Sequence, residues 1–194
     1  DTIKVMGGED WKDWMTALNE AGVLAENTVT VAYSYIGPKL TYPMYHKGTL
    51  GAAKAHLLKT AQEMTKEFSN VNAYVSVNKA LVTQASAAIP VVPLYIALLY
   101  RIMEKKQIHE NAIEQIARMY QEKLFVDTPV LDQTGQIRMD DWELREDVQS
   151  EIEAFWEKLY AHEVTDFSYI DEYWVAFRQL FGFDLPNIDY SKDV

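Results

Sequence analysis

Hydrophobic residues at helical spacing appear twice in the first seventy positions. The run 11–21 predicts a first helix, with Asp10 as a cap at its start and Gly22 at its end. A second and longer run, which Thr49 can cap, predicts a helix over 49–68.

Two β-branched and aromatic runs flank the longer of these helices. Residues 28–36 predict a strand that we expect to be buried, and residues 72–78 predict a second strand. A strand, a helix and a strand in this order form a βαβ unit with a parallel pair of strands. Ligands gather at the carboxyl ends of such strands, so residues 35–51 and those from Asn78 onward are where we expect a site.

Helical patterns dominate the rest of the chain. Four further helices are predicted, over 90–106, 110–124, 143–161 and 166–181. A turn at 132–135, between Val130-Leu131 and Ile137, predicts a small hairpin. Because no repeat or linker divides the sequence, we treat residues 1–194 as a single piece of α/β class with several additional helices.

Composition and charge narrow the classes of function. The chain has no cysteine, which excludes thiolate catalysis and disulfides and fits the cytoplasm, and its four histidines lack metal-ligand spacing, so no metal site is expected. The net charge of -11 arises entirely after residue 100, which disfavours nucleic acid and anionic membranes as partners.

The apolar stretch 85–103 contains Pro90 and Pro93 and predicts a buried helix, not a membrane span. The start of the chain has no signal-peptide pattern.

One charged residue breaks the pattern of the 49–68 helix. At 100° per residue, Lys54 falls within about 40° of the centre of the apolar stripe. The other charged residues, Lys59, Glu63, Lys66 and Glu67, fall on the opposite side. Lys54 either extends past the sheet edge to solvent or is held at the strand end to bind a ligand.

A tyrosine close to Lys54 would gain acidity. Tyr42 and Tyr45 follow the strand-end Tyr35, and a nearby ammonium lowers the pKa of a phenol from its reference value of about 10. Tyrosine and lysine are thus a workable proton-donor pair. The alternative is that these tyrosines are packing residues with satisfied hydroxyls.

Two clusters in the second half have a structural and a functional interpretation. The acidic run 140–147 either stabilises a helix start or binds a cation, although its spacing matches no calcium loop. The aromatic residues between Phe167 and Phe181 follow helical spacing and indicate core, or the lining of an acyl-chain pocket.

Several long blocks resemble the trans-2-enoyl-CoA/acyl-carrier-protein reductase family. They are Tyr33-Ser-Tyr-Ile-Gly-Pro38, then Tyr45-x8-Lys54 within Tyr-Pro-Met-Tyr-His-Lys-Gly-Thr-Leu-Gly-Ala-Ala-Lys, and Lys79-Ala-Leu-Val-Thr-Gln-Ala-Ser-Ala-Ala-Ile-Pro90. The segments 6–11 and 137–143 are also similar, so the resemblance spans essentially the whole chain.

The resemblance implies an NADH-dependent reductase of 2-enoyl thioesters in fatty acid biosynthesis, with a Rossmann-like sheet related to the short-chain dehydrogenase/reductases. It implies that Tyr45 is the catalytic tyrosine, that Lys54 contacts the nicotinamide ribose and that Tyr35 lies at the thioester of the substrate. The cofactor-contacting segment of the family corresponds to Leu81, Val82 and Thr83.

The chain departs from the family at its amino end. It lacks the Gly-x-Gly-x-x-Gly turn on which a dinucleotide pyrophosphate rests, and the family carries that half upstream. The chain therefore looks like the carboxyl-terminal catalytic portion of a longer reductase, inactive without the missing half. The alternative is a non-catalytic fragment that binds acyl thioesters or a protein partner.

Overall fold

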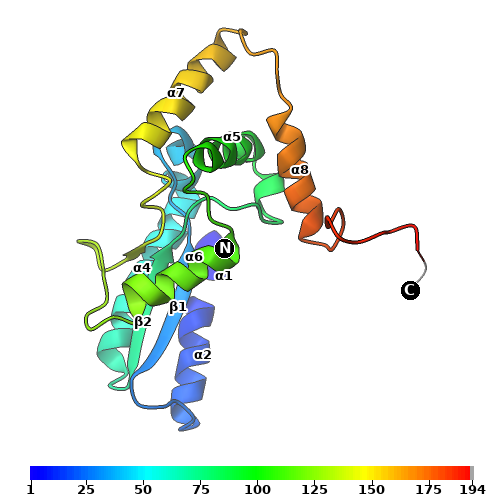
Figure 1. Ribbon diagram of the computed structural model, residues 1–194. Helices are drawn as coiled ribbons and strands as arrows, with labels where there is room; N and C mark the ends of the chain where they lie inside the picture. The colour runs from blue at the N-terminus through cyan, green and yellow to red at the C-terminus, as the bar shows by residue number, and fades with distance from the viewer. Residues whose placement is uncertain (193–194) are drawn as a thin grey trace. The chain divides into compact units, whose positions relative to one another are not determined.

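The chain folds into two compact units in the computed structural model, which describes residues 1–192 apart from the side chain of Met44 (Figure 1). Unit 1 comprises residues 1–79 and 112–141, and unit 2 comprises residues 80–111 and those from 142 onward. The polypeptide therefore leaves unit 1, returns to it and leaves it again, a division that no linker in the sequence marks.

The elements of each unit follow the predicted order of strands and helices. Unit 1 contains α1 (Thr2–Met6), α2 (Glu9–Glu20), β1 (Thr28–Ser34), the 3-10 turn η1 (Lys39–Thr41), α3 (Tyr42–Tyr45), α4 (Gly48–Glu67), β2 (Val71–Val77), α6 (Ala112–Arg118), the π-helical turn η3 (Met119–Leu124) and β3 (Ile137–Arg138). Unit 2 contains the 3-10 turn η2 (Ser86–Ala88), α5 (Val92–Lys105), α7 (Glu146–Tyr160) and α8 (Tyr169–Gln179). Within the described residues, no helix is long and apolar enough to span a membrane.

The sheet of unit 1 is parallel, in the order β1-β2-β3. Thr28 pairs with Val71 and Ser34 with Val77, so β1 and β2 end at the same edge. Helix α4 connects the two strands, which confirms the predicted βαβ unit and the α/β class.

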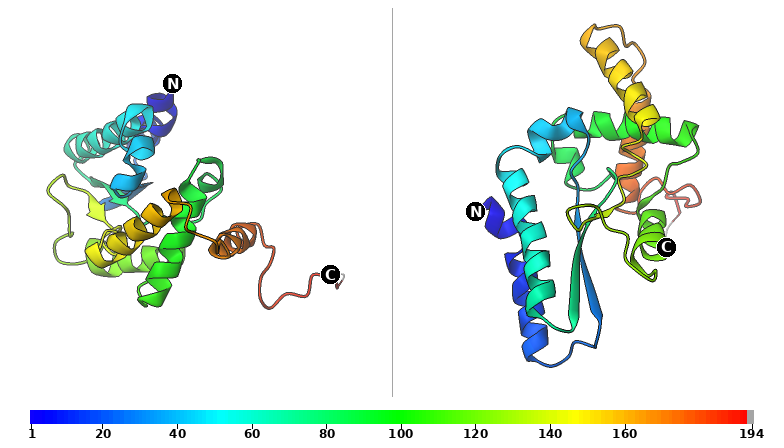
Figure 2. Two further views of the ribbon diagram at one scale, coloured as in Figure 1. Left: turned by 90° about the horizontal axis from the view of Figure 1, so that it is seen from above. Right: turned by 90° about the vertical axis from the view of Figure 1, so that its left-hand side faces the viewer.

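Helices cover both faces of this sheet. Helices α2 and α4 lie side by side along one face, as the right-hand view of Figure 2 shows. The buried residues on that face are Met15, Leu57, Ala61, Met64, Val71, Ala73 and Val75. Because successive strand residues point to opposite faces, Tyr74 packs on the other face with Met119, Leu124, Ile137 and Met139.

Strand β1 is less buried than the sequence suggested. Tyr33 is 50% exposed and Val29 is 38% exposed, because β1 is the end strand of the described sheet and pairs on one side, with β2. The other residues of β1 are half-buried, so the expectation of a buried strand was wrong.

The predicted hairpin near residue 132 was also wrong. The turn itself forms, with Gly135 N donating to the carbonyl oxygen of Asp132 at 3.0 Å. Ile137 and Arg138, however, pair in parallel with the end of β2, and Val130 and Leu131 form no strand. Residues 137–138 therefore pair with β2 and not with residues 130–131, their neighbours in the sequence.

Helix boundaries agree with the sequence to within a few residues. Gly22 ends the first helix with a φ of +66°, as predicted. Asp10 and Thr49 are not caps, because α2 begins after Gly8 and α4 after Lys47, and neither of those N-caps makes a side-chain hydrogen bond. The helix predicted to begin at Glu143 begins at Glu146 instead.

The acidic run has more than one role. Glu146 and Asp147 lie in the first turn of α7, as the helix-dipole interpretation requires. Asp140 is fully buried and makes an ion pair with Arg138, and Asp141 makes one with Arg118. These two carboxylates therefore stabilise the end of unit 1 and are not part of a helix start.

Replacing Arg118 with leucine is expected to destabilise unit 1 by about 2 kcal/mol, less than for a fully buried pair because the Asp141 side chain is one-third exposed. Arg118 donates to both carboxylate oxygens of Asp141, at 3.2 and 3.0 Å, and to the carbonyl oxygen of Met139 at 3.0 Å. Burial opposes ionisation of Asp141, but Arg118 and Lys123 still hold its pKa below the ordinary value.

Urea unfolding at neutral pH measures this loss. A lowered carboxyl pKa means that the pair stabilises the fold above the ordinary pKa and is lost as the pH falls through the lowered one. The difference between wild type and Arg118→Leu should therefore shrink in acid. Equal urea midpoints at neutral pH would contradict the assignment.

Candidate active site

Three of the predicted site residues meet just beyond the carboxyl end of β1, in unit 1. Lys54, in the second turn of α4, directs its ammonium to the hydroxyl of Ser34 at 3.2 Å. The same Nζ lies 5.8 Å from the centroid of the Tyr45 ring. The rings of Tyr45 and Tyr35 meet edge to face, with centroids 4.9 Å apart.

The Lys54 ammonium is half-buried and turned toward these neutral groups. Burial lowers its pKa below the ordinary value, because the charged form loses water. None of the ion pairs recorded among residues 1–192 involves Lys54. A half-buried cation whose described neighbours are a hydroxyl and an aromatic ring is suited to a polar or anionic ligand.

Gly37 allows the loop after β1 to pass close to Tyr35. Its φ of +75° lies in the left-handed region that favours glycine. A Cβ at this position would overlap the hydroxyl of Thr41 and lie 2.7 Å from the Tyr35 hydroxyl oxygen. Gly37 was not among the predicted site residues, although the Gly-Pro pair after the strand indicated a special turn there.

The predicted segment 81–83 lies in unit 2, where side chains hold its backbone. Val82 N donates to the Tyr100 hydroxyl at 3.0 Å, and Thr83 N donates to Ser86 Oγ at 3.0 Å. Burial raises the pKa of Tyr100 to about 12, so its phenol is protonated at neutral pH. Leu81 is half-buried and Thr83 is exposed.

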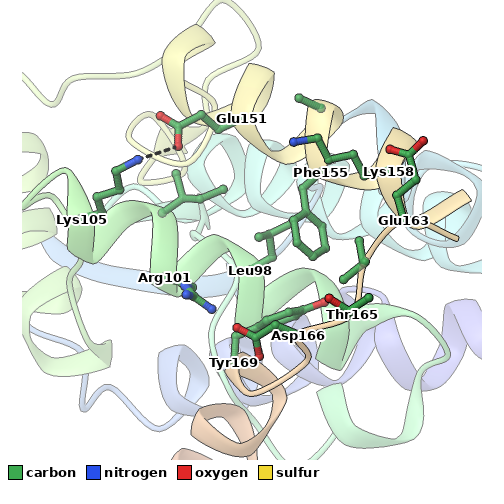
Figure 3. A pocket seen from close by; sticks show the side chains of 13 residues that line it. Leu98, Arg101, Lys105, Glu151, Phe155, Lys158, Glu163, Thr165, Asp166 and Tyr169 are labelled. Carbon is green, nitrogen blue, oxygen red and sulfur yellow. Dashed lines mark ion pairs between the residues drawn. The ribbon is translucent and has the colours of Figure 1, made fainter. Parts of the chain in front are cut away.

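A pocket of about 560 Å³ opens among α5, α7 and the linker to α8 within unit 2 (Figure 3). Phe155 and Tyr169 meet there edge to face, with centroids 5.4 Å apart. Six of its 13 lining residues are charged: Arg101, Lys105, Glu151, Lys158, Glu163 and Asp166. This mixed lining differs from that of an apolar channel for an acyl chain.

The aromatic run of α8 is only partly core. Tyr169 and Tyr173 are buried, but Phe167, Trp174 and Phe181 are between 38% and 52% exposed. Aromatic contacts along the helix, such as Tyr173 against Trp174 at 5.2 Å, link the buried and exposed rings. The core interpretation therefore holds for one side of the helix.

Two family models match this chain. Residues 1–125 match the trans-2-enoyl-CoA reductase catalytic region, and residues 131–194 match a model described as the enoyl reductase FAD binding domain. The chain belongs to the trans-2-enoyl-CoA reductase family.

Curated proteins and solved structures agree with the family models. The chain is 54% identical to an enoyl-[acyl-carrier-protein] reductase [NADH] of Cytophaga hutchinsonii and 50% identical to a trans-2-enoyl-CoA reductase of Euglena gracilis. All of the chain is matched in both, against 50% and 36% of those proteins. The Treponema denticola trans-2-enoyl-CoA reductase in complex with NAD superposes with a TM-score of 0.91 at 47% identity, over 99% of this chain and 49% of that one. The chain thus spans about half the length, or less, of these relatives.

The residues from 131 onward do not fit an FAD site. A flavin dinucleotide carries a pyrophosphate, which needs cations or a free helix N-terminus. This stretch has 16 acidic residues against five Lys and Arg. The first turns of α7 and α8 each carry two acids, Glu146 and Asp147 in one and Asp171 and Glu172 in the other. These carboxylates would repel the pyrophosphate.

Proposed function

We propose that this chain carries the tyrosine and lysine of an NADH-dependent reductase that saturates the trans-2 double bond of enoyl-CoA or enoyl-acyl-carrier-protein thioesters. The observation that carries the proposal is the half-buried Lys54 ammonium beside Tyr45 and Tyr35 in a member of this family. We place the reaction in cytoplasmic fatty acid biosynthesis. The upstream half of the longer protein completes the cofactor site, because this chain has no glycine-rich pyrophosphate turn.

Lys54 and the segment 81–83 are the groups that would hold NADH. Lys54 would donate hydrogen bonds from its ammonium to the hydroxyls of the nicotinamide ribose. In the recorded ion pairs of the described residues, no carboxylate is paired with this ammonium. NADH, when bound, supplies the hydride that adds to the β-carbon of the substrate. Leu81, Val82 and Thr83 are proposed to contact the cofactor from the loop that follows β2.

Tyr45 and Tyr35 would stabilise the charge that this addition creates. Negative charge develops on the thioester oxygen as the β-carbon is reduced, and the hydroxyl groups of the two tyrosines would donate hydrogen bonds to that oxygen. The Lys54 ammonium, 5.8 Å from the centre of the Tyr45 ring, would favour negative charge on the phenol oxygen and so would strengthen the hydroxyl as a donor. A proton from the Tyr45 hydroxyl or from water would then add to the α-carbon and complete the saturated thioester.

Consumption of NADH by the full-length protein in the presence of crotonyl-CoA tests this proposal. The expected result is formation of butyryl-CoA in equal amount to the NADH consumed, and no consumption without the thioester. The 194-residue chain alone is expected to be inactive. A full-length protein that binds crotonyl-CoA but oxidises no NADH would support the non-catalytic alternative and overturn the reductase.

Replacing Gly37 with alanine is expected to reduce turnover about tenfold, because the added methyl group displaces the Tyr35 hydroxyl and small displacements of catalytic groups are costly. Gly48→Ala is the matched control, since Gly48 also has a positive φ, of +80°, but nothing lies within 4 Å of its Cβ position. Steady-state rates and melting temperatures of both variants separate backbone strain from displacement of Tyr35. Equal rates in the two variants would show that the contact with Tyr35 has no catalytic effect.

A further inference from the structure

A buried carboxylate lies at the centre of a hydrogen-bond network in unit 2. Glu143 is 0% exposed. Its Oε2 accepts a hydrogen bond from the backbone N–H of Ala80 at 2.7 Å, and its Oε1 accepts one from the hydroxyl of Tyr95 at 2.6 Å. Gln149 Nε2 donates to the backbone oxygen of Glu143 at 2.6 Å and to the Tyr95 hydroxyl at 3.3 Å.

Burying a carboxylate costs free energy, so the presence of Glu143 at a fully buried position needs a structural reason. Removing an ionised group from water costs several kcal/mol, and charge-assisted hydrogen bonds offset part of that cost. An apolar side chain of the same volume would fill this space without the cost. What an apolar side chain could not do is accept the N–H of Ala80.

Ala80 directly precedes the proposed cofactor segment, in the loop that follows β2. Asn78 N still donates to the carbonyl oxygen of Ser34 at 2.8 Å, whereas residues 79–83 belong to no helix or strand. Side chains of unit 2 take their amides instead: Glu143 takes that of Ala80, Tyr100 that of Val82 and Ser86 that of Thr83. Glu143 is the only charged acceptor of these three.

We infer that Glu143 is a positioning residue that orients the cofactor-binding segment 81–83 through the amide of Ala80. Tyr95, from α5, orients the carboxylate directly, and Gln149, from α7, holds the backbone of Glu143 and the Tyr95 hydroxyl. The inference rests on the proposed function in one respect, that residues 81–83 contact NADH. The anchoring of the loop itself is independent of the reaction.

Glu143→Ala in the full-length protein tests both parts. Loss of the acceptor should raise amide hydrogen exchange in the peptide 80–86 about tenfold. The KM for NADH should rise about tenfold, while kcat and the KM for crotonyl-CoA stay within about twofold of wild type. Glu143→Gln keeps an oxygen for Ala80 and an amide group that can donate to the Tyr95 oxygen, so it should recover most of the affinity for NADH.

Two further variants keep the test decisive. Tyr95→Phe removes one hydrogen bond to the carboxylate and replaces Glu143→Ala as the test if the latter does not fold. It is expected to raise the exchange of peptide 80–86 and the KM for NADH about threefold. Ile152→Ala truncates a fully buried side chain of α7 and should lower the melting temperature without changing the KM for NADH.

The inference is overturned if Glu143→Ala lowers the melting temperature as Ile152→Ala does, with unchanged exchange and unchanged KM for NADH. A wild-type protein that consumes no NADH would overturn the proposed function instead. In that case the exchange measurement still decides whether Glu143 anchors the loop.

Discussion

Replacing Tyr45 with phenylalanine is expected to lower the kcat of the full-length reductase by about 10²- to 10³-fold, the usual cost of removing one donor to a developing oxyanion. The change removes a single oxygen. The ring contact with Tyr35 and the position of the Lys54 ammonium over the Tyr45 ring do not require that oxygen, so the fold and the KM for NADH should be preserved.

Tyr42→Phe is the matched control for this variant. Tyr42 lies in the same short helix α3, but its ring packs on His46, with centroids 4.8 Å apart. Its loss of a hydroxyl should leave kcat within about twofold of wild type. The role of Tyr45 would be refuted by a Tyr45→Phe enzyme that turns over as fast as Tyr42→Phe.

Replacing Lys54 with methionine is expected to raise the KM for NADH about 30-fold, because the ammonium would no longer donate to the cofactor through charge-assisted hydrogen bonds. Stability should not fall in the unliganded protein. A lysine whose pKa is lowered by burial destabilises the fold while it is protonated, and this penalty fades as the pH rises through the lowered pKa toward the ordinary value. Methionine carries no such penalty.

Titration of NADH into the full-length variants measures the affinity directly. Lys59→Met is the matched control, because Lys59 lies on α4 at the exposed side and pairs with Glu63 at 3.6 Å. Its affinity for NADH should equal that of wild type. An unchanged affinity in Lys54→Met would remove Lys54 from the cofactor site.

Local patterns were sufficient for most of the fold. The strands and helices of the βαβ unit follow from side-chain periodicity, which depends on neighbours a few positions away. The prediction of a hairpin was wrong because the true partner is distant in sequence. Ile137 pairs with Ser76, and no local pattern near residue 137 indicates that pairing. The exposure of β1 likewise depends on which strands lie beside it and not on its own residues.

The part of the candidate site that could be predicted is the part where a polar residue interrupts a regular hydrophobic pattern. Lys54 stood out because it falls on an apolar stripe, and the structure turns it toward Tyr45 and Ser34. Glu143 was hidden within an acidic run whose other members pair with arginines or begin a helix. Its partners, Ala80 and Tyr95, are 63 and 48 positions away, so only the folded chain reveals the network.

Transfer of deuterium to crotonyl-CoA from NADH that carries deuterium at both hydrogens of the nicotinamide C4, followed by mass spectrometry of the product, tests the central claim most directly. The full-length protein is expected to give butyryl-CoA with one deuterium on the β-carbon, and Tyr45→Phe to give the same product much more slowly. Butyryl-CoA without deuterium, or no butyryl-CoA from a folded full-length protein, would contradict the assignment of this chain to an NADH-dependent enoyl thioester reductase.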